Sequence, residues 1–285
     1  MTITHLGFHV LRTDKMKYYG IFSTLALCSV SFAQTELGEG VTSFATKTTN
    51  AVLDKRATPT ALTTTLPASS GAVTSAAAIP VSGSFDGGMK RYERSGNVCQ
   101  GQTETGEADA MFILENGATL SNVIIGAGQA EGVHCRGTCT INNVWWADVC
   151  EDAITFKQSS GTSYINGGGA FKADDKIIQF NGRGTVQVKN FYANDYGKIA
   201  RSCGNCSGNG GPRNFIMDNV VAHDGGVLCG INTNYGDTCK ISNSCQDDAK
   251  YCDRYQGNSN GDEPSKIGSG PDGTYCTTSN VGTNC

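Results

Sequence analysis

Short β-prone runs, each with an asparagine inside it, recur along the chain from Gly117 onward. The runs span residues 119–125, 140–146, 162–168, 185–193, 214–222 and 239–245. Their asparagines are Asn122, Asn143, Asn166, Asn190, Asn219 and Asn243. Successive asparagines therefore repeat at intervals of roughly 21–29 residues. Gly, Asn, Asp and Ser separate the runs, and no stretch has the apolar periodicity of a helix.

A repeat of this length predicts a solenoid in which each unit forms one coil. Because asparagine tolerates a left-handed backbone, its recurrence suits a bend between two strands of a coil. We therefore predict an all-β fold, a single-stranded parallel β-helix with coils of about 22 residues. A leucine-rich repeat has a similar period, but the regular leucines that it needs are absent from the runs.

Composition agrees with this architecture and narrows the function. The 285 residues include 37 glycines, and only 17% are charged, which argues against a coiled coil or a helical bundle. The formal net charge is −4 and the chain has no basic block, so we expect no nucleic-acid partner. We expect a monomer.

The start of the chain has the pattern of a secretory leader. Met16 opens a short basic segment, an apolar stretch follows, and a small-x-small signal ends at Ala33. We expect residues 1–33 to be this leader, with Met16 as its start, and the product to be secreted. No later stretch is long and apolar enough to span a membrane, so we expect no membrane partner.

Residues 34–82 are rich in Thr, Ala and Ser and show no sustained period, which predicts a linker or pro-segment. Lys55 and Arg56 in its middle are either a dibasic processing site or a solvated pair. Residues 83–285 would then form the β-helix domain.

The cysteines predict a domain stapled by disulfides. Of 13 cysteines, Cys28 would leave with the leader, and the remaining 12 allow up to six bridges in an oxidising compartment. Their pairing stays open. Cys203 and Cys206 have the spacing of a redox or zinc motif, but in a secreted chain we expect two structural disulfide partners.

Charged residues fall into register when they are counted by coils. Residues one coil apart stack about 4.8 Å from each other. Glu131, Glu151, Lys176 and Lys198 follow one another at intervals of about one coil, and Arg201 also lies about one coil beyond Lys176. This predicts two coils with acidic side chains followed by coils with basic side chains, all on one face. Asp152 joins Glu151 there only if the pair lies at a bend, because neighbours on a strand point to opposite faces.

Glu131, Glu151 and Asp152 would suit a hard cation with oxygen ligands, so we expect Ca²⁺. A solvated acidic patch is the alternative. Lys176, Lys198 and Arg201 would repel one another unless an anion lay among them. Crowding by cations would also lower the pKa of Lys176 and make it a candidate base. The alternative is a set of ordinary surface lysines. Together the two groups indicate a polyanionic substrate that carries carboxylates.

Several ordered blocks between about residues 85 and 285 resemble polysaccharide lyase family 3, the pectate lyases. They are GVHCRGTCT (132–140), NVWWADVCEDA (143–153), GGGAFKADDKIIQ (167–179), NGRGT (181–185), GKIARSCGNC (197–206) and EPSKIGSGP (263–271). The family implies a right-handed parallel β-helix that cleaves polygalacturonate, the backbone of pectin, by calcium-dependent β-elimination.

Carried over by position, the resemblance makes Glu151 and Asp152 calcium ligands, with Glu131 as a third where the family often has Asp. Lys176, Lys198 and Arg201 become the basic substrate-binding and catalytic group. Ala200 stands where the family often carries an aromatic residue.

β-Elimination needs a base that removes the C5 proton of a galacturonate, next to its carboxylate. We favour Lys176, because lysine loses its proton more readily than arginine, and give Arg201 the carboxylate clamp. The reverse assignment stays open. The product would be a 4,5-unsaturated oligogalacturonate.

Other residues have structural explanations. His134 is either a general acid or a packed, hydrogen-bonded histidine, and we favour the latter. Trp145 and Trp146 could stack on sugar, although strand alternation places one in the core.

Two rival functions remain at this point. A polygalacturonase-type hydrolase shares the fold and substrate but uses paired acids without calcium. A non-catalytic cell-wall-binding effector would keep only the fold.

Overall fold

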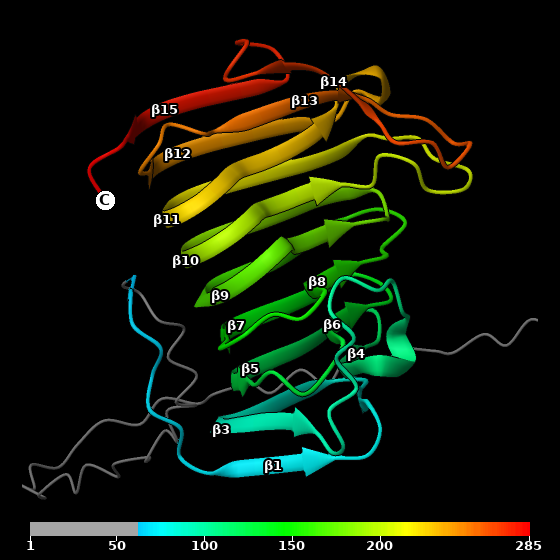
Figure 1. Cartoon of the computed structure of the whole chain (residues 1–285), viewed down its shortest axis with the longest axis vertical. Coiled ribbons are helices and arrows are strands. Elements are labelled where there is room, and N and C mark those ends of the chain that lie inside the picture. Colours follow the sequence, from blue (N-terminus) through cyan, green and yellow to red (C-terminus); the bar gives the residue numbers. More distant parts are fainter. Residues whose placement is uncertain (1–61) are drawn as a thin grey trace, which may run out of the picture. The chain divides into compact units, whose positions relative to one another are not determined.

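The computed structural model describes residues 62–285, so the expected leader, its cleavage after Ala33 and the Lys55–Arg56 pair lie outside the described residues. Within residues 62–285 every element except two single 3₁₀ turns is a strand (Figure 1). The elements are β1 (Ala72–Ser75), β2 (Ile79–Val81), β3 (Ser84–Arg94), η1 (Glu107–Asp109), β4 (Ala110–Leu114), β5 (Ala118–Ile125), β6 (Glu131–Cys135), β7 (Cys139–Trp146), β8 (Asp152–Phe156), β9 (Thr162–Phe180), β10 (Gly184–Ser202), β11 (Arg213–Asn232), η2 (Thr233–Tyr235), β12 (Thr238–Gln246), β13 (Cys252–Gln256), β14 (Ser265–Ser269) and β15 (Cys276–Gly282). No helix in this part of the chain could cross a membrane.

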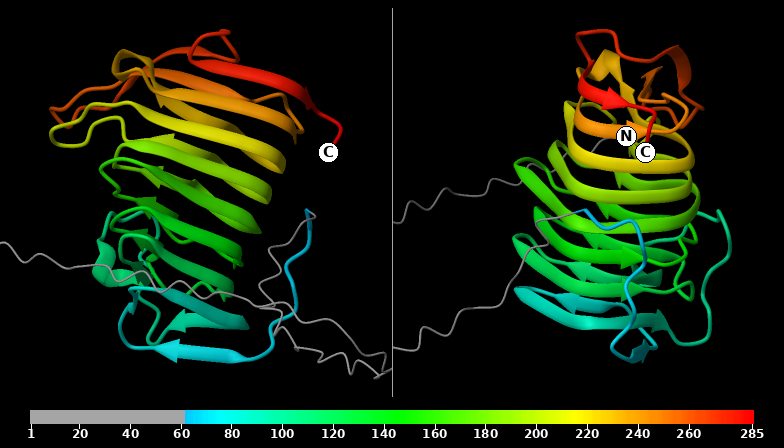
Figure 2. Two further views of the ribbon diagram at one scale, coloured as in Figure 1. Left: turned by 180° about the vertical axis from the view of Figure 1, so that it is seen from behind. Right: turned by 90° about the vertical axis from the view of Figure 1, so that its left-hand side faces the viewer.

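The strands coil into a parallel β-helix, as the repeat predicted (Figure 2). One side of the solenoid follows the order β1-β3-β5-β7-β9-β10-β11-β12-β15, and every neighbouring pair in it is parallel. A second side runs through β2, β4, β6 and β8 into the later halves of β9, β10 and β11, and then into β13. The strand β14 departs from this pattern, because it pairs antiparallel with β13.

The asparagines mark a bend in successive coils. Five of the six predicted positions have a left-handed backbone, with φ between 49° and 55°. Most of their side-chain amides donate to the preceding coil, as from Asn143 Nδ2 to Asn122 Oδ1 at 2.9 Å. The prediction is wrong by one residue at Asn166. Asn166 pairs with Asn142, so Gly167 (φ 71°) takes the bend. Glycine occupies this conformation without steric cost and leaves no asparagine signal in the sequence.

Inward-facing side chains stack in columns and form the core. One column runs along the second side through Leu114, Cys135, Phe156 and Phe180, all fully buried. Such stacking follows from the alternation of strand side chains and the register of parallel strands.

Six disulfides use all 12 cysteines of the described chain, which confirms the predicted stapling. The pairs are Cys99–Cys150, Cys135–Cys139, Cys203–Cys206, Cys229–Cys239, Cys245–Cys285 and Cys252–Cys276.

The folded domain begins earlier than the boundary that composition placed at residue 83. The strands β1 and β2 lie within the expected linker, residues 34–82, yet β1 pairs with β3 and β2 pairs with β4. Hydrogen bonding to an already formed coil supplies what the local sequence lacks in apolar residues, so composition alone misplaced the boundary.

Candidate active site

One outward-facing column of the second side carries the predicted charges. Asp152 pairs with Lys176, and Lys176 with Lys198, on β8, β9 and β10. Glu131 begins β6 two residues before the Val133–Ile154 pair, which puts it level with Asp152. Coil spacing therefore predicted the places of Glu131, Lys176 and Lys198 in this column, but Asp152 occupies the position that it gave to Glu151.

The three acidic residues form a buried cluster. One carboxylate oxygen from each of Glu131, Glu151 and Asp152 lies within 4.8 Å of the others, and each residue is at most 4% exposed. Glu151 precedes β8 in a bend, which is why it can share a face with Asp152 as the sequence analysis required. Burial, together with the neighbouring carboxylates, raises the pKa of both Glu151 and Asp152, although Lys176 opposes the shift.

This cluster fits a calcium ion. Oε2 of Glu151 and Oδ1 of Asp152 are buried and accept no hydrogen bond from the described residues. Ligand distances of 2.3–2.6 Å allow two oxygens on opposite sides of Ca²⁺ to be about 5 Å apart, which matches the separations in the cluster. A hard cation would compensate three crowded carboxylates, two of which are otherwise paired with a single lysine.

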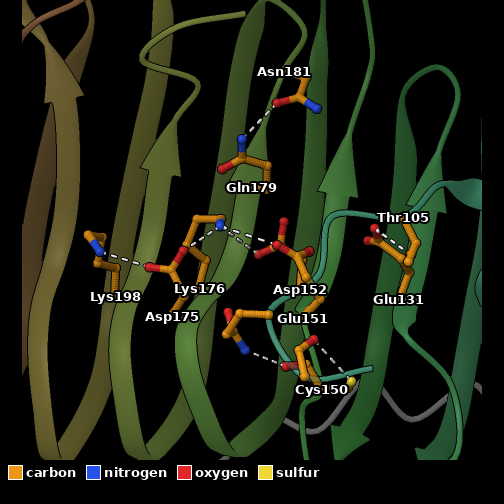
Figure 3. A network of polar contacts seen from close by, with 12 residues as sticks. Thr105, Glu131, Cys150, Glu151, Asp152, Asp175, Lys176, Gln179, Asn181 and Lys198 are labelled. Carbon is orange, nitrogen blue, oxygen red and sulfur yellow. Dashed lines mark hydrogen bonds and ion pairs between the residues drawn. The ribbon is translucent and has the colours of Figure 1, made fainter. Parts of the chain in front are cut away.

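That lysine is Lys176, which lies among carboxylates (Figure 3). Its Nζ is 2.5 Å from Asp175 Oδ2 and 3.5 Å from both Glu151 Oε1 and Asp152 Oδ1. Asp175 also accepts a hydrogen bond from Lys198 Nζ at 2.9 Å through its other oxygen. Asp175 thus bridges the two lysines and fixes the distance between them.

The surroundings of Lys176 change the expected direction of its pKa. Burial lowers this pKa, but Asp152, Asp175 and Glu151 outweigh burial and raise it well above its ordinary value. The expectation of a lowered pKa counted a bound calcium ion as well as the other basic residues, and calcium held by Glu151 and Asp152 would offset their effect on Lys176. In the structure the nearest charges are carboxylates, and they stabilise the ammonium form.

Arg201 lies apart from the Lys176 column. In the register between β9 and β10, Lys198 pairs with Lys176 and Arg201 pairs with Gln179, so Arg201 lies three residues further along β10 than Lys198. Its separation of about one coil from Lys176 in the sequence was therefore misleading, although both side chains face outward on the same side of the solenoid.

Neutral groups hold the Arg201 guanidinium. Nη1 donates to the carbonyl oxygens of Ser202 (2.8 Å) and Gly230 (3.4 Å) and to Oδ1 of Asn232 (3.0 Å). Cζ lies 4.0 Å from the centroid of the Tyr255 ring, a cation–π contact. Burial lowers the pKa of Arg201, and Tyr255 and Asp237 partly oppose this shift.

A buried pair supports Arg201 from behind. Asn232 and Asp237 are fully buried, and Asp237 Oδ2 accepts from the Asn232 backbone N–H (3.1 Å) and side-chain amide (3.2 Å). These bonds fix the amide orientation that presents Oδ1 to Arg201. Gly230 leaves room for the arginine, because a Cβ there would lie 2.7 Å from Arg201 Cδ.

The loop of residues 99–105 packs against the acidic cluster. The Cys99–Cys150 disulfide joins it to the residue before Glu151, and Gln102 Nε2 donates to the Cys150 carbonyl at 2.6 Å. Thr105 Oγ1 donates to Glu131 Oε1 at 3.4 Å. The covalent tether keeps the loop beside the carboxylates.

The remaining candidate residues contribute to packing or to disulfides. His134 is buried, and its Nε2 lies 3.0 Å from Glu131 Oε2, in agreement with the packed, hydrogen-bonded reading. Trp145 and Trp146 are both buried, so the idea that one stacks on sugar is wrong. Cys203 and Cys206 form a disulfide, as expected.

Sequence reasoning missed Asp175, Asn232 and Tyr255. Asp175 neighbours Lys176, and strand alternation argued against two adjacent residues sharing a face. Asn232 and Tyr255 lie about one and two coils beyond Arg201, and only the β10–β11–β13 pairing brings them to it. Counting by coils from Arg201 would have pointed to both segments.

Comparisons with known proteins agree with this geometry. A family model described as pectate lyase matches residues 63–262. A probable pectate lyase E of Neosartorya fischeri is 52% identical over 226 residues, which cover 79% of this chain and 86% of the relative.

The similar solved structures are also pectate lyases. The catalytic domain of pectate lyase PelI from Erwinia chrysanthemi superposes with a TM-score of 0.57 at 30% identity, covering 74% of this chain and 97% of that one. PelI in complex with tetragalacturonic acid gives a TM-score of 0.53 at 33% identity, covering 71% of this chain and 69% of that one.

Proposed function

Because the chain belongs to the pectate lyase family, we propose that it cleaves (1→4)-α-D-galacturonan, de-esterified pectin, by calcium-dependent β-elimination. The observation that carries this proposal is the buried acidic cluster lying next to a basic group on consecutive coils. Paired acids alone, as in a hydrolase, would not require the basic group.

Glu131, Glu151 and Asp152 are the residues that would hold calcium. When bound, the cation supplies positive charge that offsets the substrate carboxylate and makes the neighbouring C5 proton more acidic. The orphaned oxygens of Glu151 and Asp152 support this assignment.

Lys176 and Lys198 bind and orient the substrate carboxylates as cations. Asp175 fixes both ammonium groups. Lys198 retains N–H donors for an anion, whereas Lys176 also contacts Glu151 and Asp152 and contributes mainly its charge. Their charge also stabilises the enolate-like anion that forms as the C5 proton leaves.

Of the two candidate bases, we now favour Arg201 over Lys176. Lys176 Nζ is held 2.5 Å from the Asp175 carboxylate, which stabilises its ammonium form, whereas the groups bonded to Arg201 Nη1 are neutral and burial lowers the pKa of Arg201. The base takes the C5 proton, and the C5 electron pair forms the C4–C5 double bond as the C4–O bond breaks. The glycosidic oxygen leaves with the other half of the polysaccharide and takes a proton from water.

We also propose that the enzyme is secreted. Six disulfides within residues 62–285 support an oxidising compartment, in which pectin of plant cell walls would be the accessible substrate.

Ultraviolet absorbance of unsaturated product tests the reaction. With polygalacturonate, we expect a rising signal that chelator abolishes and added calcium restores. New reducing ends without absorbance would indicate hydrolysis. Neither signal from correctly disulfide-bonded protein would favour a non-catalytic binding role.

Charge-preserving variants test the base. Lys176→Arg keeps the cation but cannot accept a proton readily, so it should retain measurable activity if Arg201 is the base. Arg201→Lys should move the ascending limb of the kcat profile to lower pH, because a general base acts in its deprotonated form and lysine has the lower pKa. If Lys176→Arg is inactive while Arg201→Lys keeps an unshifted profile, Lys176 is the base instead.

A further inference from the structure

A cavity of about 550 Å³ continues from the site beyond Lys198. The charged column ends there, because the residue paired with Lys198 on the next coil is Val227. Positive charge nevertheless continues along the wall. Lys250, in the turn before β13, and Lys266, on β14, line the same cavity as Lys198.

The antiparallel strand β14 explains how this wall arises. Its pairing with β13 departs from the coil (Figure 1). The register of the two strands pairs Lys266 with Tyr255. Tyr255 is also the residue whose ring covers Arg201. Tyr255 therefore lines the cavity and also contacts the arginine.

Both lysines keep hydrogen-bonding capacity for an anion. Lys266 Nζ lies 2.7 Å from Asp253 Oδ1, and this carboxylate is already shared with Ser269 Oγ at 2.9 Å. Lys250 Nζ donates to Asp248 (2.8 Å) and to the Gly225 carbonyl (3.1 Å). An ammonium group has three donors, so each lysine retains at least one toward the cavity.

We propose that this cavity is a subsite for a further galacturonate residue, in which Lys250 and Lys266 recognise its free carboxylate and Tyr251 and Tyr255 contact the ring. The subsite rests on the proposed function, because its occupant is part of the same polysaccharide. Its charge makes it selective, since a methyl ester presents no anion to the lysines. The subsite thus favours de-esterified stretches of pectin.

Lysine-to-glutamine variants test the subsite. Lys250→Gln and Lys266→Gln should each raise KM for polygalacturonate about fivefold, and together about 25-fold, with kcat nearly unchanged. On highly methyl-esterified pectin the same variants should match the parent within twofold. Lys240→Gln, an exposed lysine on β12 outside the cavity, is the matched control for net charge.

A binding measurement separates this inference from the lyase activity. Retardation of the protein in polygalacturonate gels should weaken in the Lys250→Gln/Lys266→Gln variant and not in Lys240→Gln, whether or not the parent forms unsaturated product. Equal retardation and equal KM in all three proteins would refute the subsite while leaving the lyase intact. Equal losses in Lys240→Gln would show non-specific attraction and also refute it.

Discussion

Replacing Asp152 with asparagine should have opposite effects on stability with and without calcium. In the calcium-free protein, Asp152 lies within 4.8 Å of both Glu131 and Glu151 and 3.5 Å from the Lys176 ammonium. With an effective dielectric constant near 20, each repulsion is about 3.5 kcal/mol and the attraction about 4.7 kcal/mol. The repulsions exceed the attraction by about 2 kcal/mol, and relief of desolvation acts in the same direction.

The calcium-free Asp152→Asn variant should therefore unfold at a higher temperature than the parent, by about 4–8 °C for a domain of this size. Calcium at about 1,000 times its Kd stabilises the parent by about 4 kcal/mol. The variant has lost one carboxylate ligand and should gain little, so the order of the two melting temperatures reverses.

Thermal unfolding followed by circular dichroism, in chelator and in calcium, measures both effects. Asp174→Asn removes the same charge from an exposed position one coil away and should shift neither curve by more than about 2 °C. A chelated Asp152→Asn variant less stable than the parent, or equally stabilised by calcium, would refute the electrostatic reasoning.

Three further changes test the supports of the fold. Asn143→Ala should lower the free energy of unfolding by about 2–4 kcal/mol in urea titrations, because it strains a φ of 53° and leaves the buried Trp145 indole N–H without its 2.9 Å acceptor. Cys99→Ser opens a disulfide whose cysteines are 51 apart in sequence and should lower the calorimetric melting temperature, with a loss of about 4 kcal/mol in the chain-entropy model. The pKa of Asp272 is about 2, because backbone N–H groups and Arg254 outweigh the effect of burial. Since the folded pKa is depressed, this stabilisation is complete above about pH 4 and is lost as pH falls toward 2, and Asp272→Asn should remove that part of the melting-temperature profile.

Much of the fold was predictable because one bend recurs in nearly every coil. At five positions an asparagine marks the bend in the sequence. At Gly167 a glycine adopts the same left-handed conformation, and glycine has no side chain that would distinguish the position. The start of the domain was harder to predict, since β1 and β2 are formed by pairing with later coils. A strand at the end of a solenoid depends on its neighbour more than on its own composition.

The acidic cluster and the two lysines were predictable because similar coil lengths preserve register. Arg201 was assigned to the right face but to the wrong column, since the separations of Lys198 and Arg201 from Lys176 are both compatible with the average repeat. The sign of the Lys176 pKa shift depended on distances between charges, which register alone does not contain. Asp175 decides that sign together with the metal ligands.

The position of the site along the solenoid affects how the protein opens. Each coil contacts only its two neighbours, so local unfolding should begin by fraying at an end and advance coil by coil. Cys245–Cys285 and Cys252–Cys276 clamp the last coils, whereas β1, β2 and β3 contain no cysteine. Fraying is therefore directional, from β1 inward. The coils that carry the carboxylates and lysines stay protected until β1 to β4 have detached.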